Sequence, residues 1–183
     1  MISVLCASRK SIYHTIPNID VYDVDRDART FFGSGPIIAH PPCRSWSLKL
    51  RHQAKPVEGE RDLGLWCCEV LKRNGGVLEQ PAGSLLFSVG GLPIPGTLAA
   101  DLFSIQVNQF WWGYRSRKST WLCFSKIGKN EIDIPFRLEP KQSNNKIFNR
   151  MSKNQRSMTV RCFAEWLIEI ARKVRHADLS RSE

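Results

Sequence analysis

The residues best suited to chemistry in this sequence are a cysteine and a glutamate that each follow an apolar stretch. Cys43 comes after Pro41 and Pro42, directly beyond the stretch 36–39. Glu79 ends a second such stretch. A thiolate is a strong nucleophile and a carboxyl group can donate or accept a proton. The pair therefore has the residue types for covalent catalysis with proton transfer.

We expect these two side chains to meet, because the carboxyl ends of neighbouring parallel strands open on one crevice. The nearby cations His40, Arg44 and Lys49 should lower the pKa of the Cys43 thiol. Partial burial should raise the pKa of Glu79, so that it can donate a proton near neutrality. Taken singly, Cys43 is more typical of a buried inert thiol, and for Glu79 a salt-bridging or capping acid is an equally open interpretation.

A basic hairpin tip is the third element with chemical potential. Arg115 and Arg117 are one residue apart, so on a strand both point to the same face and can grip a phosphate or a carbonyl oxygen. Trp112 and Tyr114 beside them can stack on a base. The alternative is an ordinary charged turn whose aromatic residues lie in the core.

The pattern of apolar residues predicts an α/β sheet of alternating strands and helices. Expected strands are 2–7, 20–23, 36–39, one starting at 77–78, and a hairpin of 103–111 and 119–124. Expected helices are 25–32, 60–73 and an amphipathic one from Thr159 to residue 174. We expect polar loops at 45–59 and 126–155.

Length and charge predict one domain and an anionic partner. The 183 residues, 42% of them hydrophobic, suit a single domain over 1–175 with a charged tail at 176–183. A formal net charge of +10 favours DNA or a nucleotide as partner. The residues expected to contact nucleic acid are Arg44, Lys49, Arg51, Trp112, Tyr114 and Lys118.

The cysteines predict neither a metal site nor a secreted protein. The six cysteines form no Cys-x-x-Cys pair and no His stands at zinc-ligand spacing, so no metal is expected. The apolar run 2–7 is far too short for a signal or membrane-spanning segment. We therefore expect free thiols, no membrane partner and a reducing cytoplasm.

Three segments together resemble the cytosine-5 DNA methyltransferases. In that family a Pro-Cys motif supplies the thiolate that attacks carbon 6 of cytosine, a Glu segment contacts ring nitrogen 3, and an Arg-x-Arg motif follows. The present chain has Pro42 and Cys43, then Glu79 in the segment 79–84, then Arg115-Ser116-Arg117, in the same order. The segment 113–120 and the later 156–159 are also similar to small phage-encoded methyltransferase-like proteins. The likeness covers about half the chain.

The resemblance implies a Rossmann-like, methyltransferase-like fold with Cys43, Glu79, Arg115 and Arg117 as catalytic residues. For a phage-encoded protein the location would be the host cytoplasm. The family receives S-adenosylmethionine in a Phe-x-Gly-x-Gly loop, whereas residues 4–11 contain no glycine.

We therefore expect S-adenosylmethionine to bind weakly or not at all. Asp23 or Asp25 remains suited to a ribose hydroxyl, and Arg9, Lys10 and Ser11 to an anion such as a phosphate.

Two functions are compatible with these features. The first is an enzyme that modifies a pyrimidine in nucleic acid or a nucleotide, with Cys43 bonded to carbon 6 and Glu79 protonating the ring. The second is a non-catalytic protein derived from a methyltransferase, which binds nucleic acid or blocks a defence complex. Retention of both Cys43 and Glu79 favours the first, and the missing glycine loop favours the second.

Overall fold

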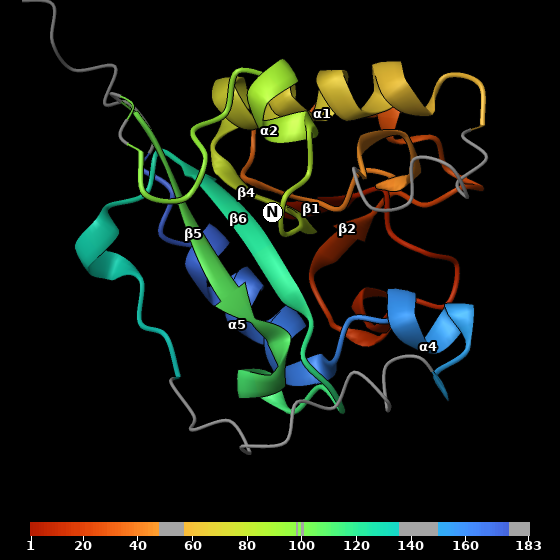
Figure 1. The fold of residues 1–183 in the computed structure, drawn as a ribbon. Coiled ribbons are helices and arrows are strands. Elements are labelled where there is room, and N and C mark those ends of the chain that lie inside the picture. The colour runs from red at the N-terminus through yellow and green to blue at the C-terminus, as the bar shows by residue number, and fades with distance from the viewer. Residues whose placement is uncertain (48–56, 98, 100, 136–149, 176–183) are drawn as a thin grey trace, which may run out of the picture.

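The computed structural model describes residues 1–47, 57–97, 99, 101–135 and 150–175. In this part of the chain, six strands form one sheet in the spatial order β2-β1-β3-β4-β6-β5 (Figure 1). The strands are β1 (Ile2–Leu5), β2 (Ile19–Val21), β3 (Ile37–Ala39), β4 (Gly76–Pro81), β5 (Leu102–Asn108) and β6 (Ser119–Ser125).

The sheet is parallel over its first four strands and antiparallel at one side. β1 pairs in parallel with β2 and β3, and β3 in parallel with β4. β6 runs antiparallel to both β4 and β5, so the hairpin β5–β6 forms the far edge. The expected α/β architecture with a mostly parallel sheet is confirmed.

Helices cover both faces of this sheet. α1 (Glu60–Asn74) and α2 (Leu86–Val89) lie on one face, and α5 (Arg161–Ala171) crosses the other (Figure 1). The short α4 (Lys153–Ser157) precedes α5. Single 3₁₀ turns occupy Ile12–Thr15, Ala28–Thr30, Arg44–Trp46, Gln109–Trp112 and Lys129–Glu131.

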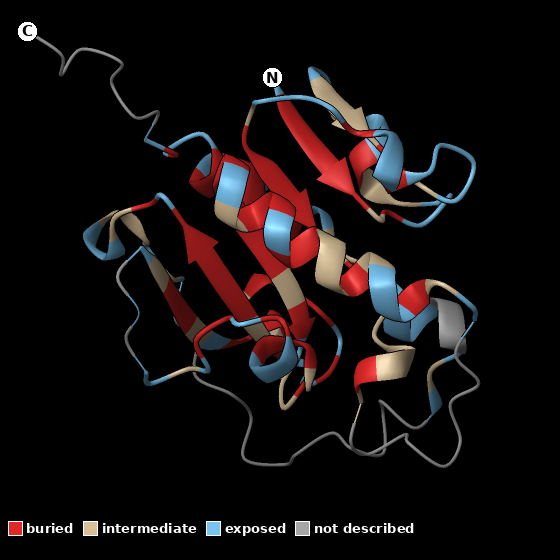
Figure 2. Ribbon diagram, turned by 90° about the horizontal axis from the view of Figure 1, so that it is seen from above, coloured by how far each residue is buried: buried red, intermediate tan, exposed pale blue. Residues whose placement is uncertain are grey.

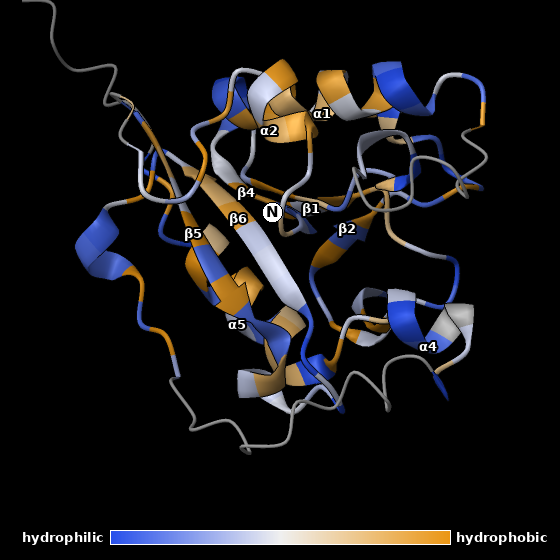
Figure 3. Ribbon diagram, viewed as in Figure 1, coloured by the Kyte–Doolittle hydropathy of each residue, from blue (hydrophilic) through white to orange (hydrophobic). Residues whose placement is uncertain are grey.

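Each face of the sheet has its own hydrophobic core. Successive residues of a strand point to opposite faces, so Ile38 packs in the α5 layer while its neighbour Ile37 packs in the α1 layer. Both are fully buried, and burial extends along the inner strands (Figure 2). The same strands are the apolar stretches of the chain (Figure 3), as expected for parallel strands covered on both sides.

The helix α1 confirms the prediction for 60–73. It begins after Gly59 and ends where Gly75 adopts a φ of 82°, a left-handed conformation that glycine adopts without steric cost. The Asn74 side chain donates to the carbonyls of Gly33 and Gly35, which ties the end of α1 to the segment before β3.

The helix expected over 25–32 is not formed. The Asp23 carboxylate accepts hydrogen bonds from the backbone N–H groups of Asp25 and Arg26. These local bonds replace helical ones, as short acidic side chains often do. The segment holds only the 3₁₀ turn Ala28–Thr30, which Asp27 caps.

Several other boundaries differ from expectation: β1 ends at Leu5 and not at residue 7, and β2 covers Ile19–Val21 and not 20–23. The strand predicted over 103–111 stops at Asn108, whose side chain accepts from the Phe110 N–H and starts a 3₁₀ turn. The last helix begins at Arg161 with Val160, not Thr159, in the capping position. The loops predicted at 45–59 and 126–155 lie partly outside the described residues, and the tail 176–183 lies wholly outside them.

Candidate functional site

The site lies where β3 and β4 end. Ala39 of β3 is paired with Leu78 of β4, so His40 and Glu79 are the next residues along the two parallel strands. Cys43 follows at the start of the 3₁₀ turn Arg44–Trp46. The sheet therefore brings together two segments that are far apart in the sequence.

The segment that carries Cys43 is fastened to the end of β4. The Gln80 amide donates to the carbonyl of Pro41 at 2.5 Å. The carbonyl of Trp46 accepts from the Leu85 N–H at 2.9 Å, and the Trp46 ring is 1% exposed. These contacts on both sides fix the backbone around Cys43.

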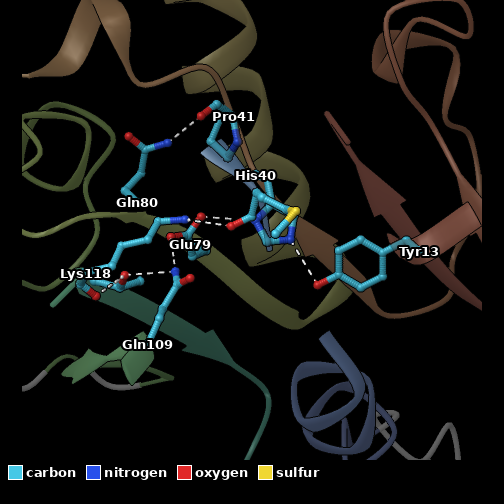
Figure 4. Close-up of polar contacts among 9 residues, drawn as sticks. Tyr13, His40, Pro41, Glu79, Gln80, Gln109 and Lys118 are labelled. Atoms are coloured by element: carbon cyan, nitrogen blue, oxygen red, sulfur yellow. Dashed lines mark hydrogen bonds and ion pairs between the residues drawn. The ribbon is translucent and has the colours of Figure 1, made fainter. Parts of the chain in front are cut away.

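Glu79 is the centre of a hydrogen-bond network (Figure 4). Its Oε2 lies 3.1 Å from Nδ1 of His40, and its Oε1 accepts from Nε2 of Gln109 at 3.1 Å. The other imidazole nitrogen, Nε2 of His40, lies 3.1 Å from the hydroxyl of Tyr13. The side chain of Glu79 is 13% exposed, so one edge of the network remains open to a ligand.

The carboxyl group of Glu79 is ionised at neutral pH. Burial alone would raise its pKa, but hydrogen bonds from His40 and Gln109 and the charges of Lys118 and His40 outweigh burial, so the pKa lies below its ordinary value. The expectation of a raised pKa is wrong, because it counted the desolvation of the strand end and not the donors around it. Glu79 rests as a proton acceptor.

The Cys43 thiol is protonated at rest. Burial, followed by the charge of Glu79, raises the pKa of Cys43, and the opposing effects of Lys118 and Arg44 are smaller. The expected lowering by nearby cations is therefore also wrong. The charges of Glu79 and Lys118 both act on the Cys43 thiol.

Lys118 is the cation of this site. Its side chain is only partly exposed, and its ammonium group donates to the carbonyl of Met158 at 3.3 Å. Burial lowers its pKa, while Glu79 and Cys43 act in the opposite direction. Lys118 stays a predicted nucleic-acid contact, and its charge also acts on the Cys43 thiol and the Glu79 carboxylate.

Arg115 and Arg117 are both exposed on either side of the buried Ser116, but this segment precedes β6 and is not a strand, so their sharing one face stays a prediction. Arg117 lines a surface pocket of about 290 Å³ at the ends of β5 and β6. The pocket is formed by Gln106, Val107, Asn108, Trp111, Arg117 and Ser119. Because the sheet order is β3-β4-β6-β5, this pocket lies on the edge-strand side of the Cys43 site.

Trp112 and Tyr114 lie in the core and not on a stacking surface. Trp112 is 6% exposed and packs against Phe163 and Trp166, with ring centroids 4.9 and 4.7 Å away. Tyr114 is 2% exposed, and its hydroxyl donates to the carbonyl of Gln155 at 3.0 Å. For these two rings the alternative of a turn with core aromatics is the correct one, because α5 needs apolar partners from the hairpin.

Three residues after Cys43 are predicted to contact nucleic acid, and only Arg44 is among the described residues. Arg44 forms an ion pair with Glu60 at the start of α1. Glu60 in turn accepts from the Val57 N–H at 3.1 Å. Lys49 and Arg51 lie outside the described residues.

The residues predicted to bind a cofactor bond to one another. Arg9 donates two hydrogen bonds to Asp25, at 2.6 and 2.7 Å. Asp23 caps the backbone of the same turn and lies 3.2 Å from Nε2 of His14. Lys10 is exposed, and Ser11 precedes a four-residue 3₁₀ turn, which is too short to form the helix N-terminus expected for an anion.

The turn after β1 contains no glycine. The chain turns after β1 through Cys6, which takes a φ of 61°, where the resembled family has a glycine loop. Its side chain packs inward, with its sulfur 3.7 Å from that of Cys67. The acid suited to a ribose is already paired with Arg9.

Three network residues were missed in the sequence. Tyr13, Gln109 and Thr120 belong to segments with no motif, and the tertiary fold brings Gln109 to Glu79, Thr120 to Gln109 and Tyr13 to His40. His40 was considered only as a cation near Cys43. The position of His40 directly before the two prolines was the one available signal that it ends the strand that leads to Cys43.

Comparison with models of protein families, with curated proteins and with solved structures found no match. Among the described residues, no three His, Cys, Asp or Glu side chains are grouped as a metal ion would require. No helix in that same part of the chain is long and apolar enough to cross a membrane.

Proposed function

We propose that the protein modifies a pyrimidine base in DNA or in a nucleotide, by adding the Cys43 sulfur to carbon 6 of the ring. The observation that carries this proposal is the parallel pairing of β3 with β4, which puts the Cys43 segment and the Glu79 carboxylate at the same end of the sheet, with Gln80 bonded to Pro41. A nucleophile and a proton carrier are two groups that such an addition needs, and Lys118 supplies a cation whose charge acts on both. The resemblance to cytosine-5 methyltransferases suggested the same chemistry.

The resting charges define where the proton must go. Cys43 holds the proton and Glu79 is the base, since the pKa of the first is raised and that of the second is lowered. As sulfur bonds to carbon 6, the thiol proton passes to Glu79. The π electrons of the C5–C6 bond move through carbon 4 to nitrogen 3, and Glu79 gives its proton to nitrogen 3. The addition consumes no other reactant.

Carbon 5 of this adduct is electron-rich and bonds to an electrophile, while nitrogen 3 returns its proton to Glu79. Carbon 5 then loses its proton to water, the C5–C6 double bond re-forms as the bond from carbon 6 to sulfur breaks, and the departing Cys43 thiolate takes back the proton from Glu79. Methyl transfer is the outcome that the resemblance suggests, and the contacts around Arg9 and Asp25 argue against S-adenosylmethionine as the donor. In this proposal Lys118, whose charge acts on Cys43 and Glu79, offsets the negative charge that develops on the ring during addition.

Hydrogen exchange at carbon 5 tests this proposal without a methyl donor. In heavy water the adduct takes up deuterium at carbon 5, and elimination releases a labelled base. We expect label in cytosine-containing oligonucleotides or nucleotides incubated with the protein, detected by mass spectrometry of the nucleosides. Cys43→Ser should abolish labelling, because a hydroxyl is a far weaker nucleophile than a thiol.

Cys162 provides the matched control. It is an exposed thiol on α5, so Cys162→Ser should leave the exchange unchanged. A second readout is a 5-fluoropyrimidine oligonucleotide, whose fluorine blocks elimination and should leave a covalent adduct on Cys43. If neither label nor adduct appears with a bound oligonucleotide, covalent catalysis is excluded.

The second candidate is a non-catalytic nucleic-acid-binding or anti-defence protein of methyltransferase descent. The observation in its favour is the turn after β1, where Cys6 contacts Cys67 and Arg9 pairs with Asp25. Binding of an oligonucleotide with equal affinity by the wild type and Cys43→Ser, together with no exchange at carbon 5, would establish this candidate.

A further inference from the structure

Two free cysteines contact each other where the turn after β1 meets α1. The sulfur of Cys6 lies 3.7 Å from that of Cys67, although the two residues are 61 positions apart in the sequence. A disulfide has a sulfur–sulfur distance of about 2.0 Å, so an approach of about 1.7 Å joins them. The fold therefore holds two thiols at the range from which a disulfide forms.

The two cysteines differ in their access to solvent. Cys6 is partly exposed, whereas Cys67 is fully buried in α1. The hydrogen bond with Cys6 and burial raise the pKa of Cys67 well above its ordinary value, so Cys67 remains a protonated thiol at neutral pH. An oxidant dissolved in water therefore reaches Cys6 first, and Cys67 is the thiol that can close a bond with it.

The backbone at Cys6 has an uncommon conformation. Its φ of 61° lies in the left-handed region, which side chains other than glycine rarely adopt. Hydrogen bonds hold the chain on each side of it: the Leu5 carbonyl accepts from the His40 N–H at 3.0 Å, and the Ala7 N–H donates to the Tyr22 carbonyl at 2.9 Å. Such a conformation, kept by its surroundings, points to a use for the side chain that it positions.

We propose that Cys6 and Cys67 are an oxidation site, at which hydrogen peroxide converts the two thiols into a reversible internal disulfide. The proposal does not depend on the proposed function. The bond ties the turn after β1 to the middle of α1, next to the point where Leu5 holds the backbone of His40. In a reducing compartment, bonds of this kind are typically transient and sense oxidants.

The oxidation balances in two steps. First, the Cys6 sulfur attacks one oxygen of hydrogen peroxide, the oxygen–oxygen bond breaks, and the leaving hydroxide takes the thiol proton as water, which leaves a sulfenic acid on Cys6. Second, the Cys67 sulfur attacks the Cys6 sulfur, the sulfur–oxygen bond breaks, and the released hydroxide takes the Cys67 proton as a second water. The two thiols lose two electrons, which the peroxide gains.

Peptide mapping of the wild-type protein tests the proposal without any variant. The reduced protein is treated with a small excess of hydrogen peroxide at neutral pH, and the remaining thiols are blocked with iodoacetamide before digestion. Trypsin cleaves after Arg9, Arg61 and Lys72, so the expected product is peptide 1–9 joined to peptide 62–72. Dithiothreitol should separate the two peptides again.

Four variants assign the link to its two sulfurs. Cys6→Ser should abolish it, and Cys67→Ser should stop the oxidation at a sulfenic acid on Cys6, which dimedone captures. Cys68→Ser is the matched control, because Cys68 lies in the same tryptic peptide as Cys67. Cys162→Ser removes an exposed thiol on α5. Both controls should keep the link.

The disulfide should also stabilise the folded protein. It closes a long loop and so restricts the unfolded chain, which should raise the melting temperature by roughly 5–10 °C once the peroxide is removed. Dithiothreitol should reverse this rise, and Cys6→Ser should not show it. No rise in a protein that carries the link would mean that the bond forms only when the chain opens, which contradicts the contact in the fold as its origin.

Two other outcomes overturn the proposal. The first is that peptides 1–9 and 62–72 stay unlinked while peroxide oxidises Cys162. The second is a link that survives Cys67→Ser or disappears in Cys68→Ser, which would assign the bond to the wrong sulfur. Neither result bears on the proposed function, which is tested by carbon 5 exchange and adduct formation at Cys43.

Discussion

Nδ1 of His40 lies 3.1 Å from Oε2 of Glu79, and both side chains are largely buried at the ends of adjacent parallel strands. The imidazole is held from its other side by the hydroxyl of Tyr13, at 3.1 Å. This relationship keeps a carboxylate ionised in a place where burial alone would protonate it.

Replacing His40 by Phe should therefore raise the pKa of Glu79. The ring shape is kept, but one donor to the carboxylate is lost, and the hydroxyl of Tyr13 loses its partner as well. We expect a loss of about 1–3 kcal/mol in the free energy of unfolding at neutral pH. Urea denaturation measures this loss in the free energy of unfolding. The exposed His14, which pairs with Asp23, gives the control His14→Phe, whose effect should be much smaller.

Glu79 should make stability fall at acidic pH. Because its pKa in the folded protein is lowered, its contribution is fully present above the ordinary carboxyl pKa of about 4.3 and is lost as the pH falls through the folded value. The difference in unfolding free energy between the wild type and Glu79→Gln should thus shrink from pH 7 to pH 3. The exposed Glu58 supplies the control Glu58→Gln, and a difference that is constant with pH would contradict the assignment.

The rate of alkylation should report whether the Cys43 thiol is protonated. Since burial and Glu79 raise its pKa, iodoacetamide should modify it slowly at pH 7 and faster as the pH rises. Glu79→Gln removes one cause of the raised pKa and should accelerate the reaction at a given pH. Site-resolved mass spectrometry also follows the exposed Cys162, whose rate should be the same in both proteins. An unchanged alkylation rate at Cys43 would show that the charge of Glu79 does not affect the pKa of Cys43.

S-adenosylmethionine should not raise the melting temperature. The residues suited to it are engaged in the Arg9–Asp25 pair and the turn through Cys6, whereas a ligand that binds the folded state must stabilise it. A thermal-shift series with S-adenosylmethionine, nucleotides and short oligonucleotides makes this measurable. Strong stabilisation by S-adenosylmethionine would show that the turn after β1 rearranges to accept it.

Binding to nucleic acid should weaken steeply with salt. If Arg115 and Arg117 each contact a phosphate, the double replacement by Ala should lower the slope of log affinity against log salt by about 1.5. Lys173 and Arg175, close to the start of β4 at the opposite end of the sheet, serve as a matched double variant with little effect. An unchanged slope after loss of Arg115 and Arg117 would place the contact surface elsewhere.

The sequence by itself determined the framework of this protein. Apolar runs that end at turn residues predicted β1, β3 and β4, and the helical period over 60–73 predicted α1. The rule that parallel strands present their carboxyl ends together was enough to bring Cys43 near Glu79. These features depend on local composition and on sheet geometry, both of which a sequence carries.

Only the tertiary structure decided the chemistry at that place. The pKa values of Cys43 and Glu79 depend on Lys118, which directly precedes β6, and that of Glu79 also on His40 at the end of β3 and Gln109 in the 3₁₀ turn after β5. The pKa and the burial of a side chain depend on all the atoms within a few ångströms of it, and most of those neighbours are distant in the chain.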